Sequence, residues 1–127
     1  MNVVDSSGWL EYLADAPGAD FFAPPIEDVE NLLVPTICLL EVARSIFRQR
    51  GEEAMLQVLA LMQQGQVIQL APEVIQLAAR FGTEHHLPLA DSVVYATGRL
   101  HLAVVWTQDG DFEGLEGVRY TPKLTAE

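Results

Sequence analysis

Residues 1–10 read MNVVDSSGWL, a short apolar run that ends at an acid and continues directly into a helix start. Asn2–Val4 is typical of a strand covered on both faces, whereas Ser6 and Ser7 carry hydroxyls of the kind that precede helices. Asp5 therefore stands at the carboxyl end of the first strand. Ligands bind beyond this end of the strands in open α/β sheets, although Asp5 can equally serve as the helix N-cap.

Short apolar segments and helical stretches alternate from this point to the end of the chain, which is the pattern of an α/β domain with a largely parallel sheet. Residues 16–28 contain two adjacent prolines and are expected to form a surface loop. The five expected strands cover residues 2–4, 32–34, 67–70, 103–106 and 118–120.

The length of 127 residues and the 50% share of hydrophobic residues indicate one globular domain over residues 1–127 and exclude a disordered chain. The sequence has neither a transmembrane run nor the features of a secretory signal, so we expect a cytoplasmic protein that does not enter a membrane. Cys38 is the single cysteine, which excludes an intrachain disulfide and predicts a small buried side chain.

The charge balance bears on the possible partners. Seven Lys and Arg stand against eighteen Asp and Glu, a formal net charge of -11. Such a chain repels nucleic acids unless cations or a basic partner intervene. The informative acids are therefore those that lie in apolar surroundings or at strand ends.

Glu41 lies in the otherwise apolar segment ICLLEVA at residues 37–43. We expect it to be largely buried, and a buried carboxylate must be paired, protonated or bound to a cation. Arg44 and Arg48 share its helical face and are candidates for phosphate contacts, because guanidinium groups suit phosphate geometry. The alternative is that all three form a solvated stripe.

Asp91 stands at the start of an apolar helix in LPLADSVVYA, residues 87–96. The favourable helix dipole is an alternative reason for an acid at that place. Asp109 and Asp111 follow the strand that ends at Trp106, where an Asp-Gly pair is also common in turns.

Together these acids are expected to face one crevice at the carboxyl ends of the strands. Crowded carboxylates repel one another unless divalent cations hold them, and oxygen ligands suit Mg²⁺ or Mn²⁺. The three histidines have no metal-ligand spacing and are expected to be structural or exposed.

At this point the sequence resembles a PIN domain, and in particular a VapC-type toxin ribonuclease of bacterial type II toxin–antitoxin systems. The resemblance spans nearly the whole chain. It rests on four segments in this order: VVDSS with WL at residues 3–10, LEV at 40–42, LPLADS at 87–92 and TQDGDF at 107–112.

The resemblance implies a three-layer α/β fold with a five-stranded, mainly parallel central sheet. It further implies a metal-dependent endoribonuclease that forms homodimers and is inhibited by an antitoxin inserted near the acidic site. The implied site residues are Asp5, Glu41, Asp91 and Asp109 as the catalytic acids, Asp111 as a fifth acid, and Ser6 and Thr107 as supporting hydroxyls.

Divalent ions would activate water and neutralise the phosphate during hydrolysis of an RNA phosphodiester. Asp5 would be the central ligand with Asp91 and Asp109 beside it, and Glu41 would bind a second ion or orient the water. The sequence leaves open whether one or two ions act and whether Asp109 or Asp111 is the fourth ligand.

Two rival interpretations remain. A response-regulator receiver would need an acid pair after the first strand and an Asp after the third, and neither is present. The second rival is a catalytically inactive PIN-fold module for protein–protein interaction, which the complete set of four acids disfavours.

Overall fold

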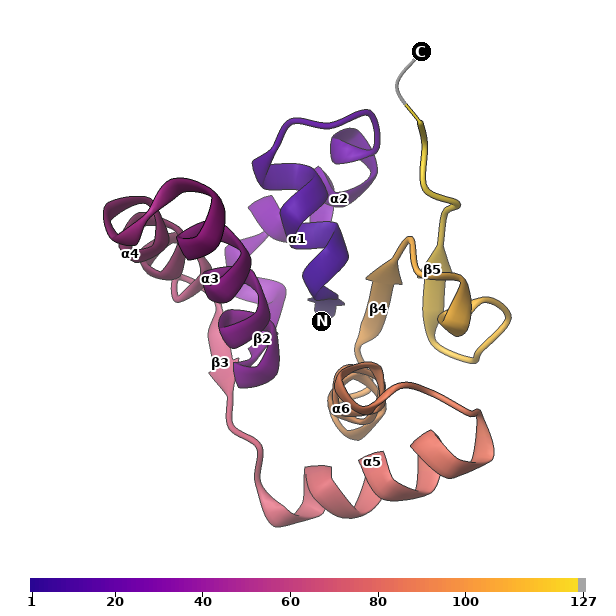
Figure 1. The fold of residues 1–127 in the computed structure, drawn as a ribbon. Helices are drawn as coiled ribbons and strands as arrows, with labels where there is room; N and C mark the ends of the chain where they lie inside the picture. Colours follow the sequence, from indigo (N-terminus) through magenta and orange to yellow (C-terminus); the bar gives the residue numbers. More distant parts are fainter. Residues whose placement is uncertain (126–127) are drawn as a thin grey trace.

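Five short apolar segments form one all-parallel sheet in a computed structural model that describes residues 1–125 (Figure 1). The predicted strands are confirmed, with their ends shifted by one or two residues in three cases. The sheet has the strand order β3-β2-β1-β4-β5. The strands are β1 (Asn2–Val4), β2 (Leu32–Pro35), β3 (Gln66–Ile68), β4 (Val104–Thr107) and β5 (Val118–Tyr120).

Six α-helices connect the strands, and local sequence sets several of their ends. Pro72 occupies the first turn of its helix as expected, and Gly51, at φ 87°, ends another in a backbone conformation that favours glycine. The helices are α1 (Ser6–Leu13), α2 (Ala19–Glu27), α3 (Thr36–Arg50), α4 (Glu52–Met62), α5 (Pro72–Glu84) and α6 (Leu89–Leu100). The described residues also form two short 3₁₀ helices, η1 (Val29–Asn31) and η2 (Gly110–Phe112).

The prediction of a surface loop over residues 16–28 is wrong, because most of this stretch, Ala19–Glu27, forms α2 with Pro24 and Pro25 inside the helix. Each internal proline costs about 3 kcal/mol through a lost hydrogen bond and a steric clash. Phe22 and Ile26 offset much of that cost, since both are buried in the main core and such side chains contribute about 1.5–3 kcal/mol each. Tertiary burial therefore outweighs the local signal of the prolines.

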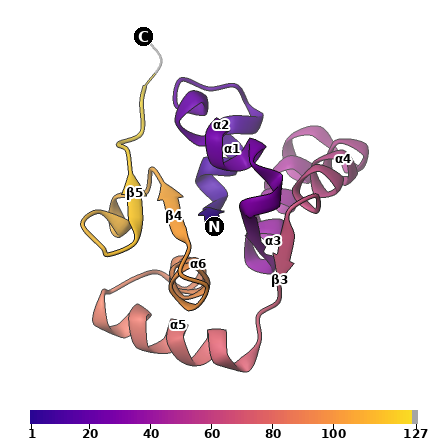
Figure 2. The same cartoon turned by 180° about the vertical axis from the view of Figure 1, so that it is seen from behind.

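Helices cover both faces of the sheet, which makes the fold a three-layer α/β structure as predicted. Successive side chains of β4 point to opposite faces. Trp106 contacts Phe21 of α2, with ring centroids 5.3 Å apart, whereas Val105 packs against Gly98 of α6. A Cβ at Gly98 would lie 2.5 Å from Val105 Cγ2, so the glycine allows the close approach of α6. Figures 1 and 2 show α5 outside α6 at one end of the molecule.

The strand order places the candidate site. The chain adds β2 and β3 on one side of β1 and then returns to add β4 on the other side, so the direction of winding changes between β1 and β4. Val4 is in register with Trp106, and the Asp5 amide donates to the Trp106 carbonyl over 3.2 Å. Asp5 and Thr107 therefore leave the sheet side by side at the switch point where ligands bind in open α/β sheets.

Within residues 1–125, none of the helices combines the length and the apolar character needed to cross a bilayer.

Candidate metal site

Asp5 is buried at the switch point and both of its carboxylate oxygens are hydrogen-bonded. Oδ1 accepts from the Gly8 amide at 2.8 Å, which makes Asp5 the N-cap of α1. Oδ2 accepts from Thr107 Oγ1 at 2.6 Å, and the Ser7 hydroxyl donates at 3.1 Å to Oδ1. Asp5 therefore both caps α1 and lies at the edge of the sheet where the crevice is expected.

Burial raises the pKa of Asp5 above its ordinary value of 3.8. The hydrogen bonds from Thr107, Gly8 and Ser7 stabilise the carboxylate and oppose that rise, whereas the negative charge of Asp109 adds to it. Hydrogen bonds therefore hold the Asp5 carboxylate in place, while the negative charge of Asp109 repels it.

Asp91, Asp109 and Asp111 form a compact group at the same edge. One carboxylate oxygen from each lies within 4.8 Å of the others. Asp91 comes from the first turn of α6, Asp109 from the segment between β4 and η2, and Asp111 from η2 itself. The structure therefore places both candidates for the fourth ligand, Asp109 and Asp111, beside Asp91.

The β4–η2 segment is shaped by its own side chains. Thr107 Oγ1, which donates to Asp5, also accepts from the Asp109 amide at 2.9 Å. Asp109 Oδ1 in turn accepts from the Asp111 amide at 2.9 Å and caps η2. One threonine hydroxyl therefore connects the acid after β1 to the acids after β4, which fits its expected supporting role.

The pKa of Asp91 rises from its ordinary value of 3.8 to about 8. Burial is the main cause, followed by the hydrogen bond and the charge of Asp109, and then by the charges of Asp5 and Asp111. Asp91 therefore keeps a proton near neutral pH unless positive charge arrives at the site.

Glu41 is exposed, so the prediction that it is buried is wrong. The core face of α3 carries Cys38, Val42 and Ile46, and Glu41 falls outside that stripe although its sequence neighbours are apolar. Leu40 beside it is 62% exposed. Glu41 still reaches the site edge, because Ser6 Oγ, one residue after Asp5, donates to its Oε1 at 2.6 Å.

Cys38 lies beneath the acids and is fully buried, as predicted. Its Sγ donates to the Val4 carbonyl at 3.8 Å. Burial raises the pKa of this thiol, and the charges of Asp5, Glu41 and Asp91 raise it further. Acids from three separate elements thus act on one buried thiol, which stays neutral.

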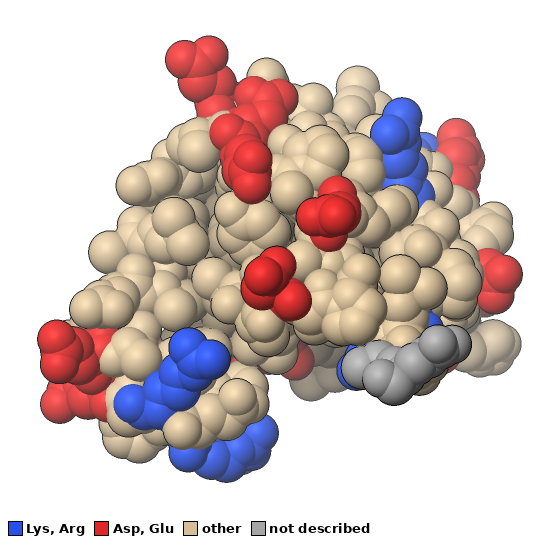
Figure 3. Space-filling model, turned by 90° about the horizontal axis from the view of Figure 1, so that it is seen from above, with Lys and Arg blue, Asp and Glu red and all other residues tan. Residues whose placement is uncertain are grey.

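Arg44 and Arg48 lie exposed on α3, the helix of Glu41. The ion pair found in residues 1–125 joins Arg99 to Glu116, so neither Arg44 nor Arg48 is paired with an acid there. On the face drawn in Figure 3 acidic groups outnumber basic ones, and most of the blue atoms lie in two separate groups.

The donor set fits a hard divalent cation. All the convergent ligand atoms are carboxylate oxygens, which Mg²⁺ and Mn²⁺ prefer, and a cation would relieve the repulsion that raises the pKa of Asp91. The histidines lie elsewhere, with His85 and His101 at the C-caps of α5 and α6.

Three polar residues near the site are not among the predicted site residues. Ser7 donates to Asp5, and Gln108 of the β4–η2 segment donates to the buried Glu11 of α1. Gln108 lies inside the motif TQDGDF, and its place between Thr107 and Asp109 is the one signal that singles it out. Glu11 carries no such signal, because an acid in a helix normally faces solvent.

Comparisons with known proteins identify the fold. The family model described as PIN domain matches residues 3–118.

Solved structures with the same fold include a toxin–antitoxin complex from Klebsiella pneumoniae, with a TM-score of 0.77, 19% identity, and coverage of 94% of this chain and 96% of that one. Another is VapC20 of Mycobacterium tuberculosis, a Sarcin-Ricin loop cleaving toxin, with a TM-score of 0.75, 17% identity, and coverage of 93% and 97%. DNA-bound VapBC from Salmonella typhimurium gives a TM-score of 0.73, 13% identity, and coverage of 95% and 96%. No curated protein matches the sequence.

The raised pKa of Asp91 predicts how the metal-free protein responds to pH. Between about 4 and about 8 the folded protein keeps the Asp91 proton that the unfolded chain has lost, so the free energy of unfolding falls as the pH rises through this window. In the variant Asp91→Asn the free energy of unfolding should fall less over this window. The variant should therefore be more stable at pH 8, relative to the wild type, than it is at low pH. Thermal unfolding in the presence of a chelator measures both effects.

Asp20→Asn is the matched control, because Asp20 is an exposed acid in the first turn of α2. It should follow the wild-type pH profile. A profile for Asp91→Asn that is parallel to the wild type would contradict the raised pKa.

Proposed function

The chain belongs to the PIN domain family, and on that premise we propose that it is a Mg²⁺- or Mn²⁺-dependent endoribonuclease, the toxin of a toxin–antitoxin pair. The observation that carries the proposal is the convergence of Asp91, Asp109 and Asp111 beside the buried Asp5 at the switch point of the sheet. Carboxylates gathered in this way serve metal-assisted hydrolysis of phosphodiesters.

Asp5, Asp91, Asp109 and Asp111 would hold the metal, which supplies activated water and neutralises phosphate charge when it is bound. The fold keeps Asp5 in one orientation through Thr107 and the α1 amide, so this ligand needs no rearrangement. Asp91 gives up its proton when a cation enters, because its raised pKa reflects burial and acid neighbours.

Glu41 is the best placed residue to orient the attacking water or accept its proton. It is exposed at the rim and fixed by Ser6 Oγ at 2.6 Å, whereas the other acids are turned to one another. A general base must be open to the substrate and held within reach of it. The exposure of Glu41, which contradicts the prediction that it is buried, therefore suits a general base.

Arg44 and Arg48 are proposed to contact the RNA backbone. They supply two of the seven basic residues of a chain with a net charge of -11, and they share a helix and its solvent face with Glu41. Guanidinium groups are suited to phosphate oxygens, and exposed arginines can adopt the geometry of an incoming strand.

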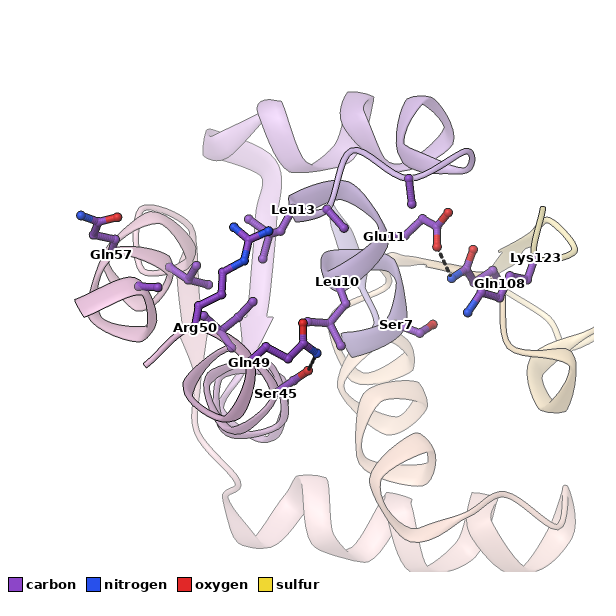
Figure 4. Close-up of a pocket in the computed structure, with 15 residues that line it drawn as sticks. Ser7, Leu10, Glu11, Leu13, Ser45, Gln49, Arg50, Gln57, Gln108 and Lys123 are labelled. Atoms are coloured by element: carbon purple, nitrogen blue, oxygen red, sulfur yellow. Dashed lines mark hydrogen bonds between the residues drawn. The ribbon is translucent and has the colours of Figure 1, made fainter. Parts of the chain in front are cut away.

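An antitoxin is proposed to bind the cleft of about 480 Å³ between α1, α3 and α4. Figure 4 shows its lining, with Leu10 between Arg50 on one side and Lys123 on the other. Ser7, which donates to Asp5, lines the same cleft, so an inserted segment would approach the acids. This partner and an RNA substrate both imply a cytoplasmic location.

A homodimer is proposed to form through the apolar groove of about 610 Å³ between α5, α6 and the start of α3. Leu89 is 87% exposed on this groove, and Leu70 and Ile75 are half-exposed beside it. Apolar surface of this kind is characteristic of protein contacts. The face lies apart from the cleft assigned to the antitoxin.

The alternative of an inactive interaction module has less support. It explains the apolar groove but gives no reason for four acids at one edge, where their mutual repulsion costs stability. We therefore favour the enzyme.

Asp5→Asn, Asp91→Asn and Glu41→Gln should each lower metal-dependent cleavage of RNA by at least about a hundredfold, because each removes a metal ligand or a proton acceptor. Glu73→Gln, an exposed acid in the first turn of α5, should cleave like the wild type. The measurement is cleavage of total and synthetic RNA with Mg²⁺, with Mn²⁺ and with a chelator.

The same variants separate the toxin from the inactive module in cells. Expression of the wild type should arrest growth, Asp5→Asn should not, and co-expression of the neighbouring gene that encodes the antitoxin should restore growth. Equal cleavage by the wild type and Asp5→Asn would mean that the acids have no catalytic role.

Arg44→Ala and Arg48→Ala should weaken RNA binding and reduce its dependence on salt. Each lost phosphate contact lowers the slope of log affinity against log salt by about 0.7 for a single strand. Arg80→Ala, an exposed arginine of α5, should leave the slope unchanged. Fluorescence anisotropy with a labelled RNA and the Asp5→Asn protein measures the slope without cleavage, and an equal loss in all three variants would refute a specific contact.

Leu89→Glu should convert the dimer to a monomer, because it places a charge at the most exposed apolar position of the groove. Leu102→Glu is the control, since Leu102 is 85% exposed but does not line the groove. Analytical ultracentrifugation measures the mass. A dimer that survives Leu89→Glu would place the interface elsewhere.

A further inference from the structure

Glu11 of α1 is a carboxylate that is 6% exposed; it lines the cleft of Figure 4 but is not one of the proposed metal ligands. Oε2 accepts from the Gly18 amide at 2.8 Å, and Oε1 accepts from Gln108 Nε2 at 3.2 Å. It takes no part in the ion pair found in residues 1–125. Burial of a carboxylate without a counter-charge is costly, so these two hydrogen bonds have to compensate for lost water.

The partner of Glu11 belongs to the segment that carries the metal ligands. Gln108 lies between Thr107, which holds Asp5, and Asp109, and it is 8% exposed. Figure 4 shows its amide turned toward Glu11 at the end of the cleft near Lys123. The side chain of Gln108 therefore ties the β4–η2 segment to α1.

The segment is also fixed at its two ends, because Thr107 Oγ1 donates to Asp5 at 2.6 Å and Phe112 of η2 is fully buried in the main core. A Cβ at Gly110 would meet nothing within 4 Å, so the chain between Asp109 and Asp111 is not packed. Between these ends, Thr107 and Asp109 form two turns within the segment itself. Between Thr107 and Phe112, the side chain of Gln108 fixes the segment to α1.

Glu11 also determines how the Gln108 amide is oriented. Gln108 Oε1 is buried and has no hydrogen-bond partner among the described residues. A flipped amide would set this oxygen against the Glu11 carboxylate, and two acceptors repel each other. The carboxylate therefore selects one orientation, and Gly18 allows the close approach because a Cβ there would lie 3.0 Å from Oε2.

We infer that Glu11 is a positioning residue for the metal site and acts through Gln108 to hold the segment that carries Asp109 and Asp111. The inference rests on the proposed metal site. Residues that orient metal ligands from outside the first ligand layer commonly contribute about ten- to a hundredfold to metal affinity. Glu11 would do so from α1, a helix whose other end is capped by Asp5.

The experiment is calorimetric titration of the whole protein with Mn²⁺. Glu11→Leu and Gln108→Leu should each weaken Mn²⁺ binding by about tenfold. The double variant should be no weaker than either single variant, because both remove the same contact. Glu11→Gln should restore most of the affinity, since its carbonyl can accept from Gly18 while its amide donates to Gln108 Oε1.

Tyr12→Phe is the matched control on the same helix, since it removes an exposed hydrogen bond to Glu27 and should leave Mn²⁺ affinity unchanged. Gln108→Leu keeps the Gly18 hydrogen bond, so it tests the inference even if Glu11→Leu does not fold. Thermal unfolding confirms which variants are folded.

Wild-type affinity in folded Gln108→Leu, or additive losses in the double variant, would overturn the positioning role. A wild type that binds no Mn²⁺ would overturn the metal site and this inference together. A wild type that binds Mn²⁺ with the expected pattern but cleaves no RNA would support the inference and refute only the nuclease activity.

Discussion

Mutual repulsion among acids at one edge of the sheet is the constraint to which the rest of the structure responds. Burial and the neighbouring Asp109, Asp5 and Asp111 together raise the pKa of Asp91 to about 8. The protein holds them with hydroxyl and amide donors, of which Thr107 is the central one. These donors fix the positions of the acids but do not neutralise their charge.

The topology explains why acids so far apart in sequence meet. In a parallel sheet all the carboxyl ends lie along one edge, and the order β3-β2-β1-β4-β5 makes β1 and β4 neighbours. Asp5 and Asp109 follow these two strands, and α6 brings Asp91 to the same edge. The fold thereby brings the acids to one place, and a metal ion would supply the positive charge that they lack.

Part of this arrangement can be predicted from sequence. Asp5 and Asp109 follow recognisable apolar strands, so their place at the strand ends depends on local pattern alone. The exposure of Glu41 could not be predicted, because its neighbours are apolar while the helix turns it away from the core face of Val42. The helix α2 was missed for a similar reason: burial of Phe22 offsets prolines that locally indicate a loop. The contact between Glu11 and Gln108 joins residues 97 positions apart and has no local signal at all.

The central claim is that these separate acids form one metal site, and anomalous diffraction from crystals soaked in Mn²⁺ tests it most directly. The account predicts an anomalous peak within bonding distance of carboxylate oxygens of Asp91 and of Asp109 or Asp111, next to Asp5. A peak elsewhere, or no peak at this edge in crystals with Mn²⁺ in excess, would contradict it.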